Sequence, residues 1–395
     1  MKYIVLVGDG MADRPLESLG NKTPLQVAKK PHMDYLAQHG MVGLVKTVPD
    51  GVSPGSDVAN LSILGYDPRK YYTGRAPLEA ASQNIKIQPN QTAFRCNLVT
   101  IQNETMIDYS AGHISTAEAK SIIESLAQEL NTSEIKFYPG VSYRHLTIIT
   151  SDFPDLVCTP PHDITNQSIS NYLPNGKNSE LVKSLMEKSV AILANHPVNK
   201  ERIKAGKNPV TKIWLWGQGK PPQMPTFQEK YQLSGGVITA VDLVKGLGKY
   251  AGLEAPNIPG ATGYLDTNYQ GKVDAARAML DKSDFVLVHV EAPDECGHQG
   301  KVDLKIRAIE EFDERVVGPI LDDIYRYPEF RLLVLPDHAT PICIQTHSSE
   351  PVPFILYTSP EEKLAPASAY DETNAATTKI YVENGFELMD ILTEK

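Results

Sequence analysis

The sequence predicts an α/β protein whose core sheet has helices on both faces, with a smaller α+β domain inserted into the chain. Short continuous apolar runs, such as residues 3–7 and 285–290, have the composition of strands buried on both faces of a sheet. Segments with helical periodicity lie between these runs, as in βαβ units. After Asp67 the sequence becomes polar and turn-rich, with several strand-like runs, which indicates the insertion.

The size and charge of the chain limit its class. A length of 395 residues predicts two domains, or one large α/β body with an insertion. The 38 Lys and Arg residues against 48 Asp and Glu residues give a formal net charge of −10 without blocks of like charge. We therefore expect no nucleic-acid partner. The sequence leaves the oligomeric state open.

The cysteine pattern and the hydropathy predict a cytoplasmic protein. The four cysteines are scattered without CxxC spacing, which fits a reducing compartment better than a disulfide framework. The opening MKYIVLVGDG has too short an apolar run for a secretory signal, and no run of eighteen apolar residues occurs. We expect a soluble chain with no membrane partner.

The first apolar run, residues 3–7, ends in the tripeptide GDG, whose central residue is Asp9. Ligands of open α/β sheets bind at the carboxyl ends of strands, which makes Asp9 a candidate binding residue. An Asp between glycines more often caps a turn, and both roles stay open at this point. A helix from about Thr23 and a strand at residues 41–48 complete a predicted βαβ opening.

The stretch GVSPGSDVANLSILGYDP, residues 51–68, presents Ser56 in a bend just before an apolar helical segment. Pro54 and Gly55 interrupt regular structure before it, so Ser56 lies near the exposed backbone N–H groups of a helix start. Such a position suits a phosphoryl group, although a serine in a turn also commonly caps a helix. To act as a nucleophile Ser56 would need a base or a metal ion to remove its proton.

Residues 75–205 are predicted to form the inserted domain, and residues 1–74 and 206–395 the core domain. The insertion contains strand-like runs at 92–101, 104–109 and 145–150 and a helical segment at 116–130. His113 in DYSAGHIS and Arg144 in GVSYRHL each lie near the end of a strand-like run. Each also has an ordinary interpretation, since the histidine could be solvated and the arginine could pair with a surface carboxylate.

The alternation of strands and helices returns from Pro209. Residues 213–217 predict a short buried strand, and the GQGK sequence at its end lacks the GxxxxGK[ST] spacing of a P-loop, which argues against ATP binding by that route. An EKY turn follows at 229–231. The further predicted elements are strands at 236–240, 285–290, 331–335 and 353–357, and helices at 241–250, 273–280, 302–325 and the C-terminus.

Three of the predicted strands end in Asp or Asp-His: the first strand, the strand before Asp294 and the strand before Asp337. Because the carboxyl ends of parallel strands lie at one edge of a sheet, these acids are expected to meet. The candidate residues there are Asp9, Ser56, Asp294, His298, Asp337, His338 and His347. Carboxylates and imidazoles without thiolates predict a dinuclear site for Mn²⁺ or Zn²⁺.

The motifs GDG, SPGSDVANLSILGYDP, TGRAPLEAAS, DYSAGHIS, TNY, PDECGHQG and PDHATP occur in this order along the chain. The set resembles the archaeal-type cofactor-independent phosphoglycerate mutases of the alkaline phosphatase superfamily. The resemblance covers nearly the whole chain, and the insertion falls between the serine and the later metal motifs. It implies an alkaline phosphatase-like core sheet and a mobile inserted domain that holds the substrate.

The resemblance also implies roles for particular residues. Ser56 would be transiently phosphorylated, and His113, Arg144 and Lys230 would contact the substrate. One metal ion would be bound by Asp294, His298 and His347, and the other by Asp9, Ser56, Asp337 and His338. Mn²⁺ is our first choice for both ions, with Zn²⁺, Co²⁺ and Mg²⁺ as alternatives, and no 2,3-bisphosphoglycerate is required.

The implied reaction interconverts 2-phosphoglycerate and 3-phosphoglycerate in glycolysis and gluconeogenesis. One departure bears on the substrate: archaeal members often carry Arg-Gly where this chain has Trp216 and Gly217. Because bacterial relatives with the WGQG variant have been proposed as homoserine kinases, a kinase-like phosphotransferase is one alternative. A metal-dependent phosphatase or sulfatase-like hydrolase is another, and a non-catalytic metal-binding protein is a third.

Overall fold

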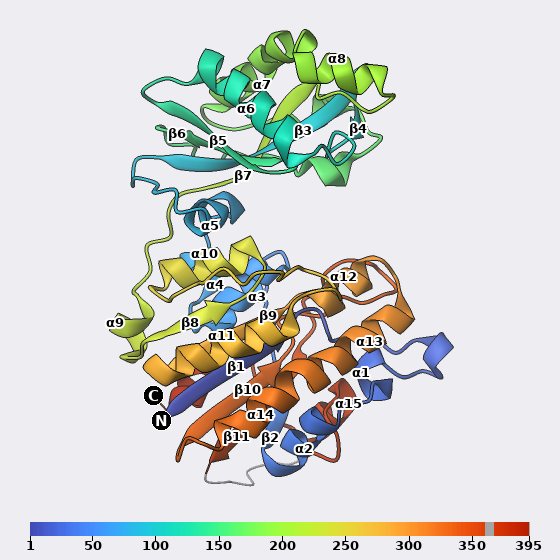
Figure 1. The fold of residues 1–395 in the computed structure, drawn as a ribbon, viewed down its shortest axis with the longest axis vertical. Coiled ribbons are helices and arrows are strands. Elements are labelled where there is room, and N and C mark those ends of the chain that lie inside the picture. The colour runs from blue at the N-terminus through green and yellow to red at the C-terminus, as the bar shows by residue number, and fades with distance from the viewer. Residues whose placement is uncertain (360–366, 395) are drawn as a thin grey trace. The chain divides into compact units, whose positions relative to one another are not determined.

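The computed structural model describes residues 1–359 and 367–394, and the chain divides into two compact units (Figure 1). Unit 1 comprises Met1–Tyr72 and Gln223–Lys395, and unit 2 comprises Thr73–Pro222. Within these described residues, no helix combines the length and the apolar character that crossing a bilayer requires. All four cysteines are free thiols.

A mixed sheet of seven strands forms the centre of unit 1, in the order β12-β2-β11-β10-β1-β9-β8. Its strands are β1 (Lys2–Gly8), β2 (Met41–Val45), β8 (Gly235–Ile238), β9 (Phe285–Val290), β10 (Phe330–Leu335), β11 (Val352–Ser359) and β12 (Tyr381–Val382). The strand β1 pairs in parallel with both β9 and β10, whereas β11 runs antiparallel to β10 and β2. The three strands that precede Asp9, Asp294 and Asp337 are therefore adjacent and parallel, as predicted.

Helices cover both faces of this sheet, which confirms the predicted fold class. On one face Val286 and Val288 of β9 share a core with Val273 and Ala276 of helix α11 (Tyr269–Lys282). On the other face Val237 of β8, which is paired with Leu287, approaches Gly248 of helix α10 (Asp242–Tyr250) so closely that a Cβ atom there would lie 2.9 Å from the valine side chain. The alternation of side chains along the strands explains both contacts.

The remaining helices of unit 1 are short, and prolines mark several of their starts. They are α1 (Pro24–Val27), α2 (Pro31–His39), α3 (Ser56–Ile63), α4 (Pro68–Tyr71), α9 (Phe227–Tyr231), α12 (Ala292–His298), α13 (Val302–Phe312), α14 (Gly318–Ile324), α15 (Glu372–Thr377) and α16 (Leu388–Thr393). The single helix predicted from Thr23 is two helices, because Pro31 has no N–H to continue the first. The helix predicted at 302–325 contains a π-helical turn at Asp313–Val317.

Unit 2 is built on an antiparallel sheet of five strands in the order β4-β3-β6-β5, with β7 also paired to β3. The strands are β3 (Thr92–Gln102), β4 (Thr105–Asp108), β5 (Ile135–Val141), β6 (Arg144–Ile149) and β7 (Lys212–Gly219), and the helices are α5 (Arg75–Ser82), α6 (Thr116–Leu130), α7 (Ser179–Ala194) and α8 (Pro197–Lys204). Phe94, Ile122, Val182 and Trp214 share its core. Helices α5, α7 and α8 were not predicted from the sequence.

The boundary predicted at residue 205 differs from the structure, which groups residues 206–222 with unit 2. The reason is the strand β7, which pairs antiparallel with β3 and contributes Trp214 and Trp216 to the core of unit 2. The apolar run at 213–217 identifies a buried strand correctly. The apolar run does not indicate which sheet the strand joins, because the choice of sheet depends on pairing with residues far away in the sequence.

Candidate metal centre

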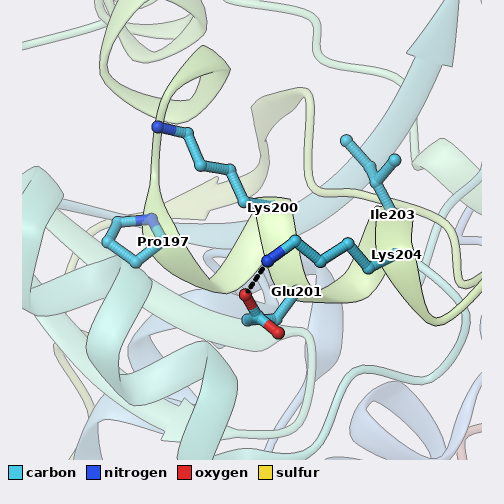
Figure 2. Close-up of a pocket in the computed structure, with 5 residues that line it drawn as sticks. All are labelled: Pro197, Lys200, Glu201, Ile203 and Lys204. Atoms are coloured by element: carbon cyan, nitrogen blue, oxygen red, sulfur yellow. Dashed lines mark hydrogen bonds and ion pairs between the residues drawn. The ribbon is translucent and has the colours of Figure 1, made fainter.

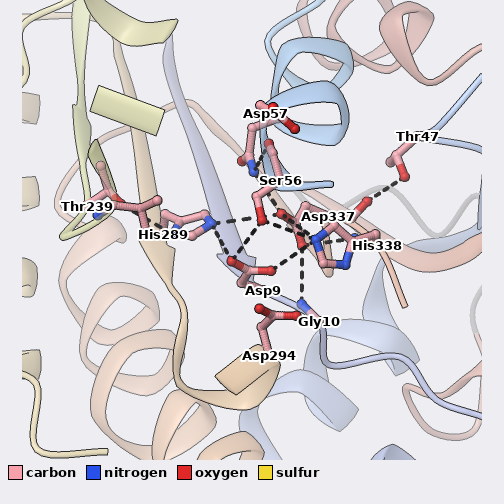
Figure 3. A network of polar contacts seen from close by, with 12 residues as sticks. Asp9, Gly10, Thr47, Ser56, Asp57, Thr239, His289, Asp294, Asp337 and His338 are labelled. Atoms are coloured by element: carbon pink, nitrogen blue, oxygen red, sulfur yellow. Dashed lines mark hydrogen bonds and ion pairs between the residues drawn. The ribbon is translucent and has the colours of Figure 1, made fainter. Parts of the chain in front are cut away.

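The three acidic residues predicted at strand ends are buried together in unit 1 (Figure 3). Asp9 directly follows β1, and its N–H donates a hydrogen bond to Val290 O of β9 (2.9 Å). Asp294 lies in the first turn of α12, after β9, and Asp337 follows β10. Their exposed fractions are only 0–4%. The parallel pairing of β1 with both neighbours explains why residues so distant in sequence meet.

Ser56 begins α3, and its side chain lies at this cluster. Its Oγ atom is 3.4 Å from Asp9 Oδ2 and 3.2 Å from His338 Nε2. Asn60, one turn later, donates from Nδ2 to Ser56 O (2.9 Å) and to Asp337 Oδ2 (2.8 Å), which ties the start of the helix to the acidic cluster. Ser56 therefore lies at a helix N-terminus, as the sequence predicted, and faces both a carboxylate and an imidazole.

Asp294, His298 and His347 form the first group that could hold a metal ion. His298 Nε2 is 3.2 Å from Asp294 Oδ2, and His347 Nε2 is 3.4 Å from Asp294 Oδ1. The two imidazole Nε2 atoms are 2.9 Å apart. On the far side of its ring, His298 Nδ1 lies 3.0 Å from Gln345 O, a backbone partner that fixes the ring.

Asp9 and Asp337 lie at the centre of the second group, with a histidine on each side. His338 Nε2 is 3.5 Å from Asp9 Oδ1 and 3.7 Å from Asp337 Oδ2. His289 Nε2 is 3.2 Å from Asp9 Oδ2 and 3.9 Å from Asp337 Oδ2. Two sets of ligand atoms here are compact enough to hold an ion: Asp9, His289 and Asp337, and Asp9, Asp294 and His338.

The electrostatics of the cluster favour a bound cation. Burial, together with the charges of Asp337 and Asp294, raises the pKa of Asp9 well above its usual range. Burial alone would also raise the pKa of Asp294, but hydrogen bonds with His298 and His347 outweigh it and lower that pKa. Among the described residues, Asp9 Oδ1 has no hydrogen-bond partner although it is buried. Crowded carboxylates with an unsatisfied oxygen are the donor set that a divalent ion would complete.

A second layer of side chains holds the cluster in place. Thr340 Oγ1 donates to Asp294 Oδ1 (2.5 Å) and lies 3.2 Å from His338 Nδ1. Lys305, fully buried, donates from Nζ to Thr340 O (2.8 Å) and to Asp13 Oδ2 (2.7 Å). These contacts fix the loop that carries His338.

All seven residues predicted for the metal site lie in this one region of unit 1, although their roles stay predictions. Sequence reasoning missed three of their neighbours: Asn60, His289 and Thr340. A signal existed for His289, because it is the one polar residue in the apolar run FVLVHV. Asn60 stands in the mainly apolar segment VANLSIL, which was interpreted only as a helix, and Thr340 gave no comparable signal because it follows His338 and Ala339 and precedes a proline.

His113 and Arg144, the predicted substrate contacts of the insertion, lie beside one aromatic residue of unit 2. The His113 ring is 6.1 Å from the Tyr143 ring, and the Arg144 guanidinium is 5.6 Å from it. Tyr109 completes the group, 5.7 Å from Tyr143 and 6.5 Å from His113. Both predicted residues are exposed. We name this group, His113, Arg144, Tyr143 and Tyr109, the aromatic cluster.

Lys230, the third predicted substrate contact, belongs to α9 in unit 1. Its ammonium group donates to Gly65 O and lies 5.1 Å and 4.9 Å from the rings of Tyr66 and Tyr231. Burial lowers its pKa. These contacts give Lys230 a structural role within unit 1. Its contact with a substrate stays a prediction.

Trp216 stands where the resemblance leads us to expect an arginine, and a cation lies against its ring. The guanidinium of Arg95 lies 4.3 Å from the ring centroid, and Arg95 is paired with Glu79 at 3.0 Å. Trp216 Nε1 donates to Asn97 Oδ1 (3.0 Å). In this chain β3 therefore brings a positive charge next to the position where an arginine on β7 would stand.

The hollow beside α8 in unit 2 is shown in Figure 2, and it is unrelated to these residues. It is lined by Pro197, Lys200, Glu201, Ile203 and Lys204, all from that helix. None of the predicted site residues lines it. We assign it no function.

The fold and the cluster together define an α/β protein with a candidate metal site next to a serine at a helix N-terminus. Comparison with known proteins identifies the family. The family described as 2,3-bisphosphoglycerate-independent phosphoglycerate mutase matches residues 37–199. The chain is 53% identical over 396 residues to the protein of that name from Methanosarcina barkeri, and 50% identical over 399 residues to the probable one from Geobacter sulfurreducens; both alignments cover all of both chains.

Solved structures agree with this grouping. The PH0037 protein from Pyrococcus horikoshii aligns with a TM-score of 0.84 at 27% identity, covering 100% of this chain and 96% of the other. The cofactor-independent phosphoglycerate mutase from Thermoplasma acidophilum aligns with a TM-score of 0.66 at 27% identity, covering 100% and 99%. The chain belongs to the 2,3-bisphosphoglycerate-independent phosphoglycerate mutase family.

Proposed function

We propose that this chain is an isomerase that interconverts 2-phosphoglycerate and 3-phosphoglycerate through a phosphoserine at Ser56, with no need for 2,3-bisphosphoglycerate. The observation that carries the proposal is the position of Ser56 Oγ, 3.4 Å from Asp9 Oδ2 and 3.2 Å from His338 Nε2, in a chain of this family. A role in glycolysis and gluconeogenesis, and the cytoplasmic location expected from the sequence, belong to the same proposal.

Two divalent ions are part of the proposal. Asp294, His298 and His347 would hold one, and Asp9, Ser56, Asp337 and His338 the other. Buried carboxylate and imidazole groups fit such ions, and the absence of thiolate ligands from both sets makes Mn²⁺ our first choice. When bound, the ions lower the pKa of a serine hydroxyl and neutralise the oxygens of a transferring phosphoryl group.

Ser56 would act as the temporary acceptor of the phosphoryl group. Its Oγ forms a bond to phosphorus as the bond to one glycerate hydroxyl oxygen breaks, and the reverse step returns the group to the other hydroxyl. The start of α3 favours this chemistry, because the N-terminal end of a helix carries a partial positive charge that attracts an anionic group. Asn60 would keep Ser56 in position through its bonds to Ser56 O and Asp337.

The glycerate must stay bound between the two steps, and this is the proposed role of His113, Arg144 and Lys230. The exposed guanidinium of Arg144 is suited to a bidentate grip on a carboxylate. Water must be kept from the phosphoserine, because hydrolysis there would turn the mutase into a phosphatase.

A coupled assay tests the proposal directly. After removal of metal with a chelator, the chain should form 2-phosphoglycerate from 3-phosphoglycerate when Mn²⁺ is added back, with no nucleotide present. A requirement for ATP and homoserine would instead identify a homoserine kinase, and release of inorganic phosphate a hydrolase. Metal binding without any turnover would leave the non-catalytic alternative.

A further inference from the structure

His289 is a histidine in a strand that is otherwise apolar. It lies in β9, paired in register with Val7 of β1, and its side chain is fully buried. The ring points from β9 toward Asp9, with Thr239 behind it (Figure 3). Nothing in the proposed reaction uses this side chain so far. A buried histidine needs partners for both ring nitrogens, because a buried polar atom without one has lost its hydrogen bonds to water and gained nothing in their place.

The Nε2 atom of His289 lacks a hydrogen-bond partner among the described residues. It is nevertheless surrounded by carboxylate oxygens, at 3.2 Å from Asp9 Oδ2 and 3.9 Å from Asp337 Oδ2. One oxygen of Asp9 is unpaired as well. Buried nitrogen and oxygen atoms without hydrogen-bond partners, gathered among carboxylates, suit a cation, and Asp9, His289 and Asp337 offer ligand atoms within 4.8 Å of one another.

The other side of the ring is held in the way typical of a metal-bound histidine. His289 Nδ1 lies 3.3 Å from Thr239 Oγ1, and Thr239 Oγ1 also accepts from Val241 N (3.0 Å). Lys272 Nζ donates to His289 O (2.9 Å), which ties the backbone at this point to α11. A histidine that binds a metal through Nε2 donates its Nδ1–H to such a partner, and the hydroxyl oxygen has a lone pair for it.

We propose that His289 is a further ligand, through Nε2, of the ion that Asp9 and Asp337 hold. The inference rests on the proposed metal site and adds a residue to it. Each ion would then have two imidazole ligands: His298 and His347 for one, His289 and His338 for the other. The chain orients His289 for this role through Thr239 and Lys272.

The test uses Co²⁺, whose unpaired electrons shift the proton resonances of coordinated imidazoles. We expect His289→Gln to show one fewer shifted, exchangeable N–H resonance than the unchanged protein and to bind one of the two ions more than about 100-fold more weakly. Thr239→Val should weaken the binding of the same ion by about tenfold and leave the number of shifted N–H resonances unchanged. An unchanged count and unchanged affinity in His289→Gln would overturn the inference.

A matched control is His145, which is also buried but lies in unit 2, where its Nδ1 accepts a hydrogen bond from Gly140 N (2.9 Å). His145→Gln should leave the shifted resonances and both affinities as they are. If the unchanged protein itself binds no Co²⁺, the proposed metal site fails. If it binds two ions and His289→Gln binds them equally well, only the inference about His289 fails.

A second measurement needs no variant, and so does not depend on how His289→Gln folds. In the Zn²⁺-loaded chain, long-range ¹H–¹⁵N spectra report which ring nitrogen of each histidine carries the proton. Ligation through Nε2 requires the proton of His289 on Nδ1. A proton on Nε2 would mean that His289 only donates a hydrogen bond to Asp9, and would overturn the inference.

Discussion

Two groups of residues hold their polar side chains in opposite ways. One is the candidate metal site of unit 1, which we name the metal cluster: Asp9, Ser56, Asp294, His298, Asp337, His338 and His347. The other is the aromatic cluster of unit 2. Asp9 and Asp337 are fully buried at the ends of adjacent parallel strands, and their neighbours are fixed by a second layer of hydrogen bonds. His113 and Arg144 are exposed and lie at turns of an antiparallel sheet beside a tyrosine ring. The first arrangement costs desolvation and provides rigidity, whereas the second costs little and leaves the side chains accessible.

The difference teaches what each unit is suited to do. A site that binds ions must remove charges from water and hold them within tenths of an ångström, which packed strand ends achieve. A site that meets a small anion has to admit it and release it, which exposed side chains permit. The comparison predicts that substitutions of the proposed metal ligands change both metal content and turnover, and that substitutions in the aromatic cluster change turnover alone.

The largest expected effect is that of Ser56→Ala, which removes the proposed acceptor. Mutase activity should fall by on the order of 10⁴-fold or more, because no other hydroxyl replaces the phosphoserine. The ion at Asp294, His298 and His347 should still bind. Rapid quench of the unchanged protein with phosphoglycerate, followed by peptide mass spectrometry, should detect phosphate on Ser56.

Labelled water gives an independent check on Ser56. In ¹⁸O water a mutase puts no solvent oxygen into the phosphate of its product, whereas a hydrolytic route must. Full interconversion by Ser56→Ala, or label in the product phosphate, would rule out the phosphoserine route.

The next largest effect is expected for the metal ligands. Asp294→Ala should lower turnover by about 10³-fold or more, because loss of a bound ion removes several kcal/mol of charge stabilisation. The chain should remain folded by circular dichroism, since Asp294 lies in the first turn of α12 and is not one of the hydrophobic core residues. Elemental analysis should show one ion lost, and His338→Ala should behave in the same way for the other ion. Turnover within a few-fold of the parent, with metal content unchanged, would contradict the ligand assignment.

Arg144→Ala tests the other half of the comparison. We expect turnover to fall by about 10²-fold while both ions stay bound, because the substrate loses an anchor but the metal cluster is untouched. Lys136→Ala, which removes another exposed cation from the same small sheet, serves as the control and should have little effect. Loss of an ion in Arg144→Ala would break the proposed division between the units.

How far the sequence predicted the molecule also differs between the two regions. In unit 1, apolar runs ending in Asp9, Asp294 and Asp337 gave both the strands and the place where the acids meet, because the ends of parallel strands converge by geometry. Ser56 was found from the helix start that follows Gly55. His289 was missed because the run around it was interpreted only as a buried strand.

In unit 2 the sequence predicted less. Residues 116–130 were predicted as a helix with the bounds that α6 has, and in the structure a capping box at Ser115 and Glu118 marks its start. The pairing of β7 with β3, and with it the boundary at Pro222, could not be read from local pattern, since antiparallel partners far apart in sequence are selected by tertiary packing. The proximity of His113, Tyr143 and Arg144 likewise depends on how the loop between β4 and α6 meets the turn between β5 and β6.

A change of pH alone, without any substitution, should alter metal binding, and this effect belongs to unit 1 alone. Burial would lower the pKa of His298, but the hydrogen bond and charge of Asp294 outweigh it and raise that pKa to about 9 in the metal-free chain. Ligation needs the neutral imidazole, so below this pH a proton must leave as an ion binds. The apparent affinity should therefore rise by about tenfold per pH unit from neutral pH to about pH 9 and level off above it.

Competition titrations with a chelator measure this slope, and calorimetry in two buffers counts the protons released. Asp9, whose pKa is also raised, releases a further proton when the other ion binds. His298→Gln removes only the proton of His298, so this variant separates the two contributions. An affinity that stays flat between about pH 7 and 9 in the unchanged protein would show that His298 is not protonated beside Asp294 when the ion arrives.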